Sequence, residues 1–122
     1  MSDILEFAEQ FFNAVQGGDI DAVAGFYRDD VTVWHNFDNL DQSREDNLAT
    51  LAGISSRYDE FGYEDVRHTA VEDGFLRQHV IKATIGEKTV NVPAVLRVYV
   101  ESGKIHRIEE YFDRGQLNIV FG

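Results

Sequence analysis

The chain has 122 residues, a formal net charge of −11 and no cysteine, and 43% of its residues are hydrophobic. This size and apolar content predict a single globular domain, residues 1–122, with a buried core. The acidic balance argues against nucleic acid and membranes as partners, because nucleic acid and anionic lipid recruit basic surfaces. The lack of cysteine excludes disulfides, thiol nucleophiles and thiolate metal ligands. An acidic N-terminus without a signal-peptide pattern and the absence of a long apolar stretch predict a cytoplasmic protein.

The first third of the chain predicts helices around one strand. Apolar residues recur at helical spacing after Ser2, a possible cap, and the Gly17-Gly18 pair would end that helix. Asp19 can cap a second, short helix, and Ser43 with Asp46 forms a possible capping box for a third. The predicted elements are a helix over residues 4–16, a helix over 20–27, a strand over 31–37 and a helix that ends at about 54.

From about Tyr63 the hydrophobic period changes to two, which is typical of strands. The short segments EDG, IGE and ESGK read as tight turns between them. Helices on one face of such an antiparallel meander predict the α+β class. The predicted strands are residues 63–71, 75–85, 88–100 and 105–112.

Four polar side chains share the parity of apolar neighbours and should therefore face inward. They are His35, Arg77, His79 and Glu110. Buried polar groups cost free energy without partners, so these four must pair with one another or line a wet cavity. A structural alternative is that each is satisfied within the core, with an Arg77–Glu110 ion pair setting the sheet register.

The occurrence of all four on three strands favours a site over a packed core. His68 and His106 lie on strands of ambiguous parity, and we expect them at the surface. Trp34 and Asn36 have the opposite parity to His35, although a bulge could turn either of them inward.

Three segments resemble the NTF2-like superfamily, and within it the SnoaL-like branch, over nearly the whole chain. These segments are FYRDDVTVWHNFD, GFLRQHVIKATIGEKTVNVPA and ESGKIHRIEEYFD. The resemblance implies a curled antiparallel sheet wrapped by three N-terminal helices into a cone with an internal pocket. It also implies homodimers that pair through the outer sheet face. The fold hosts many unrelated activities, so the resemblance alone does not define a reaction.

Three related enzymes supply mechanisms for comparison. Limonene-epoxide hydrolase has an Asp–Arg–Asp triad, and matching from the GKI segment places Arg77 on its arginine and His79 and Glu110 on its two aspartates. Its Tyr and Asn match either Val33 and His35 or Trp34 and Asn36.

Ketosteroid isomerase has its base where this chain has His35. Its oxyanion donors fall near Phe11 and Val92, which cannot donate a hydrogen bond. A steroid isomerase with that oxyanion hole is therefore not expected. The acid–base carboxylate of SnoaL-type polyketide cyclases is similar in role to Glu110.

The leading hypothesis is a cofactor-independent acid–base enzyme that acts on a small apolar or polycyclic molecule. It could be an isomerase, cyclase, dehydratase or epoxide hydrolase. Glu110 would orient His79 as the general base or acid, and Arg77 would hold Glu110 ionised or bind a substrate oxyanion. His35 would be a second proton-transfer group. The alternatives are a non-catalytic binding module, and a metal site on His35, His79 and Glu110, which the positive charge of Arg77 opposes.

Substrate contacts are expected at Trp34, Asn36, Phe75 and Val92. For the homodimer, the expected outer face of the strand over residues 88–100 mixes polar and aromatic groups, which suits an interface. Those groups are Thr89, Asn91, Arg97 and Tyr99. The apolar tail GQLNIVFG could add a strand, cover the pocket or cross to a partner.

Overall fold

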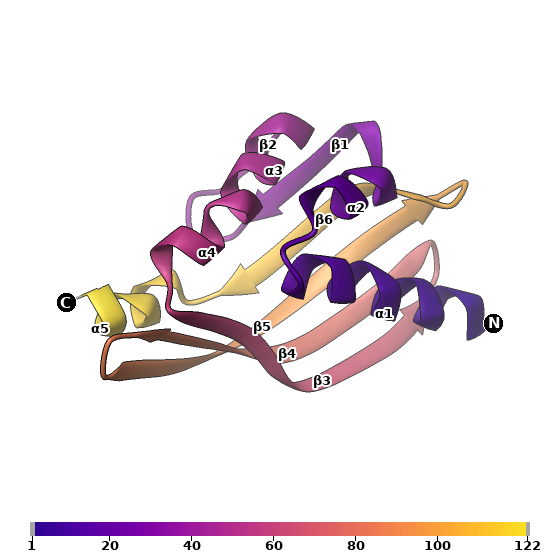
Figure 1. Ribbon diagram of the computed structural model, residues 1–122. Coiled ribbons are helices and arrows are strands. Elements are labelled where there is room, and N and C mark those ends of the chain that lie inside the picture. Colours follow the sequence, from indigo (N-terminus) through magenta and orange to yellow (C-terminus); the bar gives the residue numbers. More distant parts are fainter. Residues whose placement is uncertain (1, 122) are drawn as a thin grey trace.

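The computed structural model describes residues 2–121 as a curled, open, six-stranded sheet with helices on its inner side (Figure 1). The strand order is β2-β1-β6-β5-β4-β3, and every pair is antiparallel except β1 with β6. The helices are α1 (Ser2–Gln16), α2 (Ile20–Phe26), α3 (Arg44–Ala52), α4 (Ile54–Arg57), η1 (Arg114–Leu117) and α5 (Asn118–Phe121). The strands are β1 (Tyr27–His35), β2 (Leu40–Gln42), β3 (Glu60–Val71), β4 (Gly74–Ile85), β5 (Lys88–Glu101) and β6 (Lys104–Phe112).

The predicted α+β class and the long elements are confirmed, with changes at their ends. Asp19 and Ser43 cap α2 and α3, because their side chains accept hydrogen bonds from the backbone N–H groups of Ala22 and Asp46. Tyr27 was predicted at the end of the second helix, but it begins β1, and α1 already includes Ser2. The short strand β2 and helix α4 were not predicted.

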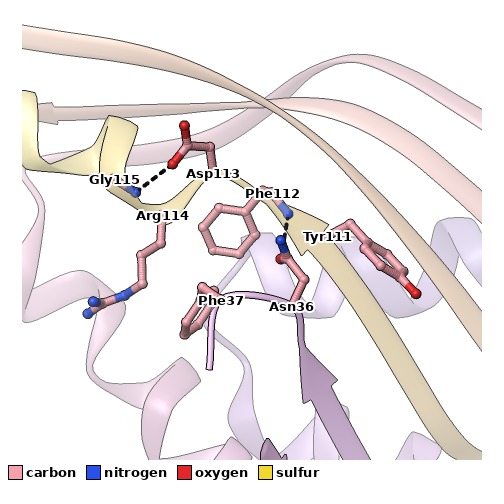
Figure 2. Close-up of a pocket in the computed structure, with 7 residues that line it drawn as sticks. All are labelled: Asn36, Phe37, Tyr111, Phe112, Asp113, Arg114 and Gly115. Atoms are coloured by element: carbon pink, nitrogen blue, oxygen red, sulfur yellow. Dashed lines mark hydrogen bonds between the residues drawn. The ribbon is translucent and has the colours of Figure 1, made fainter. Parts of the chain in front are cut away.

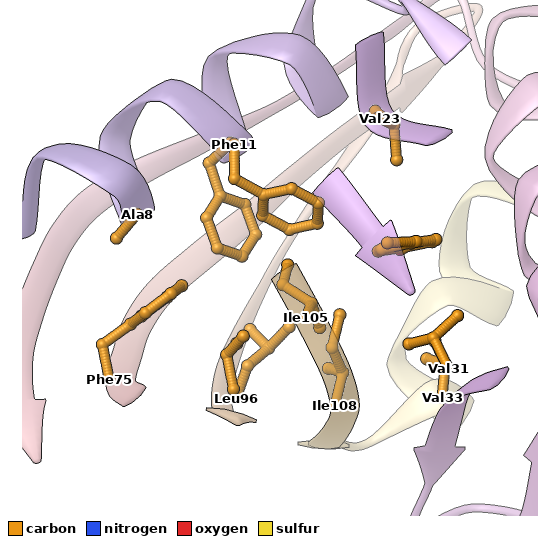
Figure 3. Packing of buried hydrophobic residues seen from close by; sticks show 12 residues of the cluster. Ala8, Phe11, Val23, Val31, Val33, Phe75, Leu96, Ile105 and Ile108 are labelled. Carbon is orange, nitrogen blue, oxygen red and sulfur yellow. The ribbon is translucent and has the colours of Figure 1, made fainter. Parts of the chain in front are cut away.

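The core lies between α1, α2 and the inner face of the sheet, where aromatic rings from α1 meet aliphatic residues of the strands (Figure 3). Phe11 packs against Phe12, Phe26 and Tyr27 with ring centroids 4.9–5.8 Å apart. Alternate residues of β5 are buried, as the period of two predicts. These are Val90, Val92, Ala94, Leu96 and Val98.

The C-terminal tail forms η1 and α5 and packs on the inner face of β4 and β5, so it does not add a strand. Leu117 and Val120 are buried there in a second cluster that includes Ile81, Val92 and Ala94. The tail therefore closes the sheet end away from the N-terminus of α1 (Figure 1). Within residues 2–121, no helix has the length and hydropathy needed to cross a membrane.

Gly74 starts β4 at a place where the backbones of two strands come unusually close. A Cβ atom on this residue would lie 1.9 Å from the carbonyl oxygen of Val98, and its φ angle is 155°. Only glycine fits without moving β5, so this contact sets how β4 is seated against β5.

We expect Gly74→Ala to lower the free energy of unfolding by at least about 2 kcal/mol, because the added methyl overlaps backbone rather than a mobile side chain. Gly86→Ala is the matched control. Gly86 lies in the next turn at φ 61°, and a Cβ atom added there would have no neighbouring atom within 4 Å. The expected loss of free energy of unfolding is therefore about 1 kcal/mol, from the left-handed backbone alone. Urea unfolding followed by circular dichroism measures both, and equal losses would contradict the overlap at Gly74.

Candidate functional site

One transverse row of side chains crosses the inner face of the sheet. The strand register aligns His68, Arg77, Leu96, Glu110 and His35 on β3, β4, β5, β6 and β1. Neighbouring strands are about 4.8 Å apart, so the row brings groups together that are far apart in the sequence. Leu96 divides it into a basic half and a half that holds the carboxylate.

The carboxylate half is a His35–Glu110 pair. His35 Nε2 lies 3.1 Å from Glu110 Oε1, and the two side chains are 13% and 17% exposed. A carboxylate only accepts hydrogen bonds, so a neutral His35 in this pair is expected to carry its proton on Nε2 and its lone pair on Nδ1. Among the described residues Nδ1 has no hydrogen-bond partner, and the His35 ring packs beside the rings of Phe37 and Phe112.

This pairing differs from the expected one, in which Glu110 would orient His79 and pair with Arg77. Parity placed all three on the inner face, but it does not say which strands are neighbours. The parallel pairing of β1 with β6 sets His35 directly opposite Glu110. Arg77 and Glu110 are instead separated by the whole width of β5.

The basic half centres on Arg77, which is only 3% exposed. Its Nε donates to His79 Nδ1 at 2.7 Å, and its Nη1 lies 3.0 Å from His68 Nε2. The guanidinium carbon lies 3.8 Å from the ring centre of Phe12 and 4.9 Å from that of Tyr63. Buried arginines are usually paired with acids, yet no carboxylate in the described part of the chain forms a salt bridge with Arg77.

His79 is held as a neutral hydrogen-bond donor. Burial, followed by the positive charge of Arg77 and the proximity of His68, lowers the pKa of His79 to about 3. A guanidinium only donates, so His79 Nδ1 must be the acceptor and Nε2 must carry the proton. This Nε2 is buried and finds no acceptor among residues 2–121. The expected role of general base or acid therefore does not fit His79.

His68 belongs to this cluster, although we expected it at the surface. A bulge shifts the register of β3 between Glu64 and Arg67, and Asp65 adopts a φ of 51°. The extra residue changes the parity, so both Tyr63 and His68 point inward. Burial and the charge of Arg77 lower the pKa of His68, while Glu9 opposes them. The positive φ of Asp65 marks the bulge in the structure. The amino-acid sequence around Asp65 gives no sign of this backbone conformation, so the change of parity was not predictable.

Two tyrosines also belong to the site and were not predicted. The ring of Tyr63 stacks on that of His79, with centroids 4.3 Å apart. The Tyr27 hydroxyl donates to Asn47 Oδ1 at 2.7 Å. Burial raises the pKa of both tyrosines, and the negative charge of Glu110 raises it further. The negative charge of Glu110 therefore acts on Tyr27 of β1 and also on Tyr63 of β3, at the opposite edge of the sheet.

Two openings lead toward this row. The first, here the Phe37 pocket, has a volume of about 470 Å³ and is lined by Asn36, Phe37, Tyr111, Phe112, Asp113, Arg114 and Gly115 (Figure 2). Phe37 and Phe112 in its wall also contact the His35 ring. The second, here the Tyr63 cleft, has a volume of about 280 Å³ between the C-terminal end of α1, α3, α4 and the start of β3. Tyr63 connects that cleft to His79.

The four expected substrate contacts fall in different places. Asn36 lines the Phe37 pocket, and its side-chain oxygen accepts a hydrogen bond from the backbone N–H of Phe112 (Figure 2). Trp34 lies on the outer face against Tyr111 and donates to Asn39. Phe75 and Val92 are fully buried in the packed core.

Neither of the two alternatives around β1 holds as a pair, because Asn36 lines the Phe37 pocket. Val33 and His35 face inward, and Trp34 faces outward. No group of three or more His, Asp or Glu side chains that could hold a metal ion is found in the described residues. The alternative of a metal site on His35, His79 and Glu110 finds no support, because His79 bonds to Arg77 and only His35 pairs with Glu110.

A family model described as the SnoaL-like domain matches residues 8–108. The chain belongs to the SnoaL-like family. The resemblance to the NTF2-like superfamily and the predicted curled sheet are thereby confirmed. None of the curated proteins compared matches this SnoaL-like chain.

Solved structures share the fold over almost the entire chain. A proposed polyketide cyclase from Xanthomonas campestris pv. campestris has a TM-score of 0.83 and 18% identity, over 98% of this chain and 96% of that one. Another from Pseudomonas putida has a TM-score of 0.82 and 19% identity, over 96% and 97%. A proposed hydroxylase from Streptomyces galilaeus has a TM-score of 0.82 and 13% identity, over 96% and 93%. At these identities the likeness is one of fold, and together with the two openings it suggests a small-molecule pocket protein.

The buried, neutral His79 makes stability depend on pH. Its folded pKa lies below the unfolded value of 6.5, so the unfolded chain binds a proton that the folded chain excludes. Stability is therefore lost as pH falls from 6.5 toward 3. His79→Gln keeps an acceptor for Arg77 but cannot titrate, so its free energy of unfolding should fall less steeply, by up to about 1.4 kcal/mol per pH unit.

Urea unfolding at pH 7, 6 and 5 measures this difference in slope. The same substitution at His106, which lies beside Tyr99 and away from the cluster, controls for the loss of a histidine. Parallel curves for wild type and His79→Gln would contradict the exclusion of the proton from His79.

Proposed function

We propose that this SnoaL-like protein is an acid–base enzyme that removes a proton from the carbon next to a carbonyl group of a small, largely apolar substrate. The observation that carries the proposal is the His35–Glu110 pair, with Nε2 3.1 Å from a carboxylate oxygen and Nδ1 without a polar partner within residues 2–121. A carboxylate that orients an imidazole and stabilises its protonated form is the usual arrangement around a histidine base.

The position of the pair supports access to a substrate. His35 is partly exposed and its ring contacts Phe37 and Phe112, which line the Phe37 pocket. Aromatic walls suit the apolar body of a substrate, whereas Asn36 and Arg114 at the rim are polar. Four of the solved structures of similar fold are described as proposed polyketide cyclases.

In the proposed step, His35 Nδ1 takes a proton from the acidic carbon. The electrons of the C–H bond form a carbon–carbon double bond, and the carbonyl electrons move to oxygen, giving an enolate. The imidazolium that results is stabilised by the Glu110 carboxylate at Nε2. The proton can then return to another carbon, as in an isomerisation, or the enolate can attack a second carbonyl, as in a cyclisation.

We expect the wild-type protein to accelerate the exchange of acidic carbon-bound hydrogens for deuterium in aryl 1,3-dicarbonyl compounds. His35→Gln should slow the exchange by about 10²- to 10⁴-fold because it removes the base. Glu110→Gln should also slow it, because a neutral amide cannot stabilise the imidazolium. Proton NMR in D₂O follows the loss of the exchangeable signal.

His106→Gln is the control, since this histidine lies on β6 but outside the row. Unchanged exchange in both His35→Gln and Glu110→Gln would refute the proposed base. If wild-type protein binds the compounds, as thermal shift would detect, without any exchange, the non-catalytic binding module replaces the enzyme.

We also propose that two copies pair through the outer sheet face. Support comes from an aromatic pair there, because the Trp34 and Tyr111 rings are 5.1 Å apart and Tyr111 is 46% exposed. Val95, half-buried, is the register partner of Tyr111 and extends the apolar area onto β5. Aromatic residues at the centre and charged residues at the rim are typical of interfaces.

Tyr111→Asp should convert this dimer to a monomer in sedimentation velocity, because it buries a charge in the paired face. Gln10→Asp introduces the same charge on the exposed surface of α1 and should leave the dimer intact. A wild-type protein that sediments as a monomer at all concentrations would exclude the pairing.

A further inference from the structure

Two features of β4 are not used by the proposed base. Arg77 is a buried guanidinium without a carboxylate partner among the described residues, and His79 has a buried N–H without an acceptor there. Both groups carry a cost in free energy, because buried charges and donors normally find partners. Both costs would be offset by a ligand that brings an electron-rich oxygen to the cluster.

We propose that His79 Nε2–H donates a hydrogen bond to the oxyanion of the ligand, an enolate or phenolate oxygen. Arg77 is the residue that positions the His79 ring. The inference rests on the proposed function, because the enolate is the species that the His35–Glu110 pair would form. Beyond the base, the inference names His79 as the group that binds the developing negative charge. It also names the class of inhibitor that the site should prefer, a phenolate or enolate.

The hydrogen bond from Arg77 selects the form of His79 that can do this. With Arg77 Nε 2.7 Å from Nδ1, the imidazole cannot place its proton on Nδ1, so a single neutral tautomer with a proton on Nε2 remains. The positive charge behind Nδ1 polarises the ring and makes the Nε2–H a stronger donor.

The surroundings keep this donor in place. Phe12 from α1 covers the guanidinium, and Tyr63 from β3 stacks on the imidazole. His68 from β3 contacts Arg77 and accepts from it. None of the groups that hydrogen-bond to or stack on Arg77 or His79 is a carboxylate, and the negative charges of Glu110 and Glu9 act on this cluster only from a distance, at Tyr63 and His68.

The register also places donor and base on opposite sides of β5. His79, Ala94 and Phe112 are aligned across β4, β5 and β6, one row away from Arg77, Leu96 and Glu110. Two strand spacings separate His79 from Phe112, roughly 10 Å. The side chains between them are Ala94 and Leu96, both apolar. Ala94 packs in one cluster with Leu117 and Val120 of the C-terminal tail, so a ligand that contacts both His79 and His35 has to displace this part of the tail.

Substituted 2-naphthols of graded acidity are suitable probes, since their phenolates resemble an enolate and need no turnover. The wild-type protein should bind the more acidic naphthols more tightly at pH 7, with the bound form ionised in its absorption spectrum. His79→Leu, which removes the donor, should weaken phenolate binding by about 10- to 100-fold. His79→Gln retains an N–H and an acceptor for Arg77 and should recover most of the affinity.

Nitrogen-15 NMR of the histidine rings tests the role of Arg77 directly. In wild type, His79 should remain a single neutral Nε2–H tautomer from pH 5 to 8, and its Nε2–H signal should shift on naphtholate binding. In Arg77→Met, the ring should lose its single tautomer and titrate at higher pH. A wild-type His79 protonated on Nδ1, or an Nε2–H signal unaffected by saturating naphtholate, would overturn the proposal even if His79→Leu fails to fold.

The two proposals fail separately. His35→Gln should lose deuterium exchange while its naphtholate affinity stays within about twofold of wild type. Unchanged naphtholate binding in His79→Leu would overturn the oxyanion donor and leave the base intact. Unchanged exchange in His35→Gln and Glu110→Gln would remove the base but not the donor.

Discussion

The hydrogen bond from Arg77 to His79 is the interaction on which the inner face of this protein depends. It joins two adjacent inward positions of β4, and it holds a charged guanidinium in a place where the described residues offer no carboxylate. Aromatic rings from α1 and β3 supply part of the missing stabilisation through their faces. The consequence is chemical as well as structural, because His79 is thereby restricted to one neutral form.

The sheet register divides the polar groups into two parts with different properties. Glu110 and His35 face each other across the parallel β1–β6 pair, near an opening, where an imidazole can exchange protons. Arg77, His79 and His68 lie on the other side of Leu96, where burial and the positive charge of Arg77 lower the pKa of both histidines. Environments that separate the properties of similar groups in this way are typical of sites that carry out acid–base chemistry.

Sequence periodicity was informative wherever strands are regular. It assigned the inward side of β4, β5 and β6 correctly, because alternation needs no knowledge of neighbours. It failed at β3, where one bulge changes the parity and brings His68 inward. It also failed for Phe75 and Val92, since an inward strand residue can lie either in a packed core or beside a cavity, and only the covering elements distinguish the two.

The sequence by itself determined the α+β class, the family, and the inward placement of His35, Arg77, His79 and Glu110, because these depend on local periodicity and on motifs. The tertiary structure decided which of the four are partners. Pairing depends on strand order, and β1 lies next to β6 only through a connection that spans most of the chain. Because of that long-range contact, Glu110 pairs with His35, and Arg77 bonds to His79. The proposed base is therefore His35, and His79, which the sequence favoured as the base, is a neutral donor.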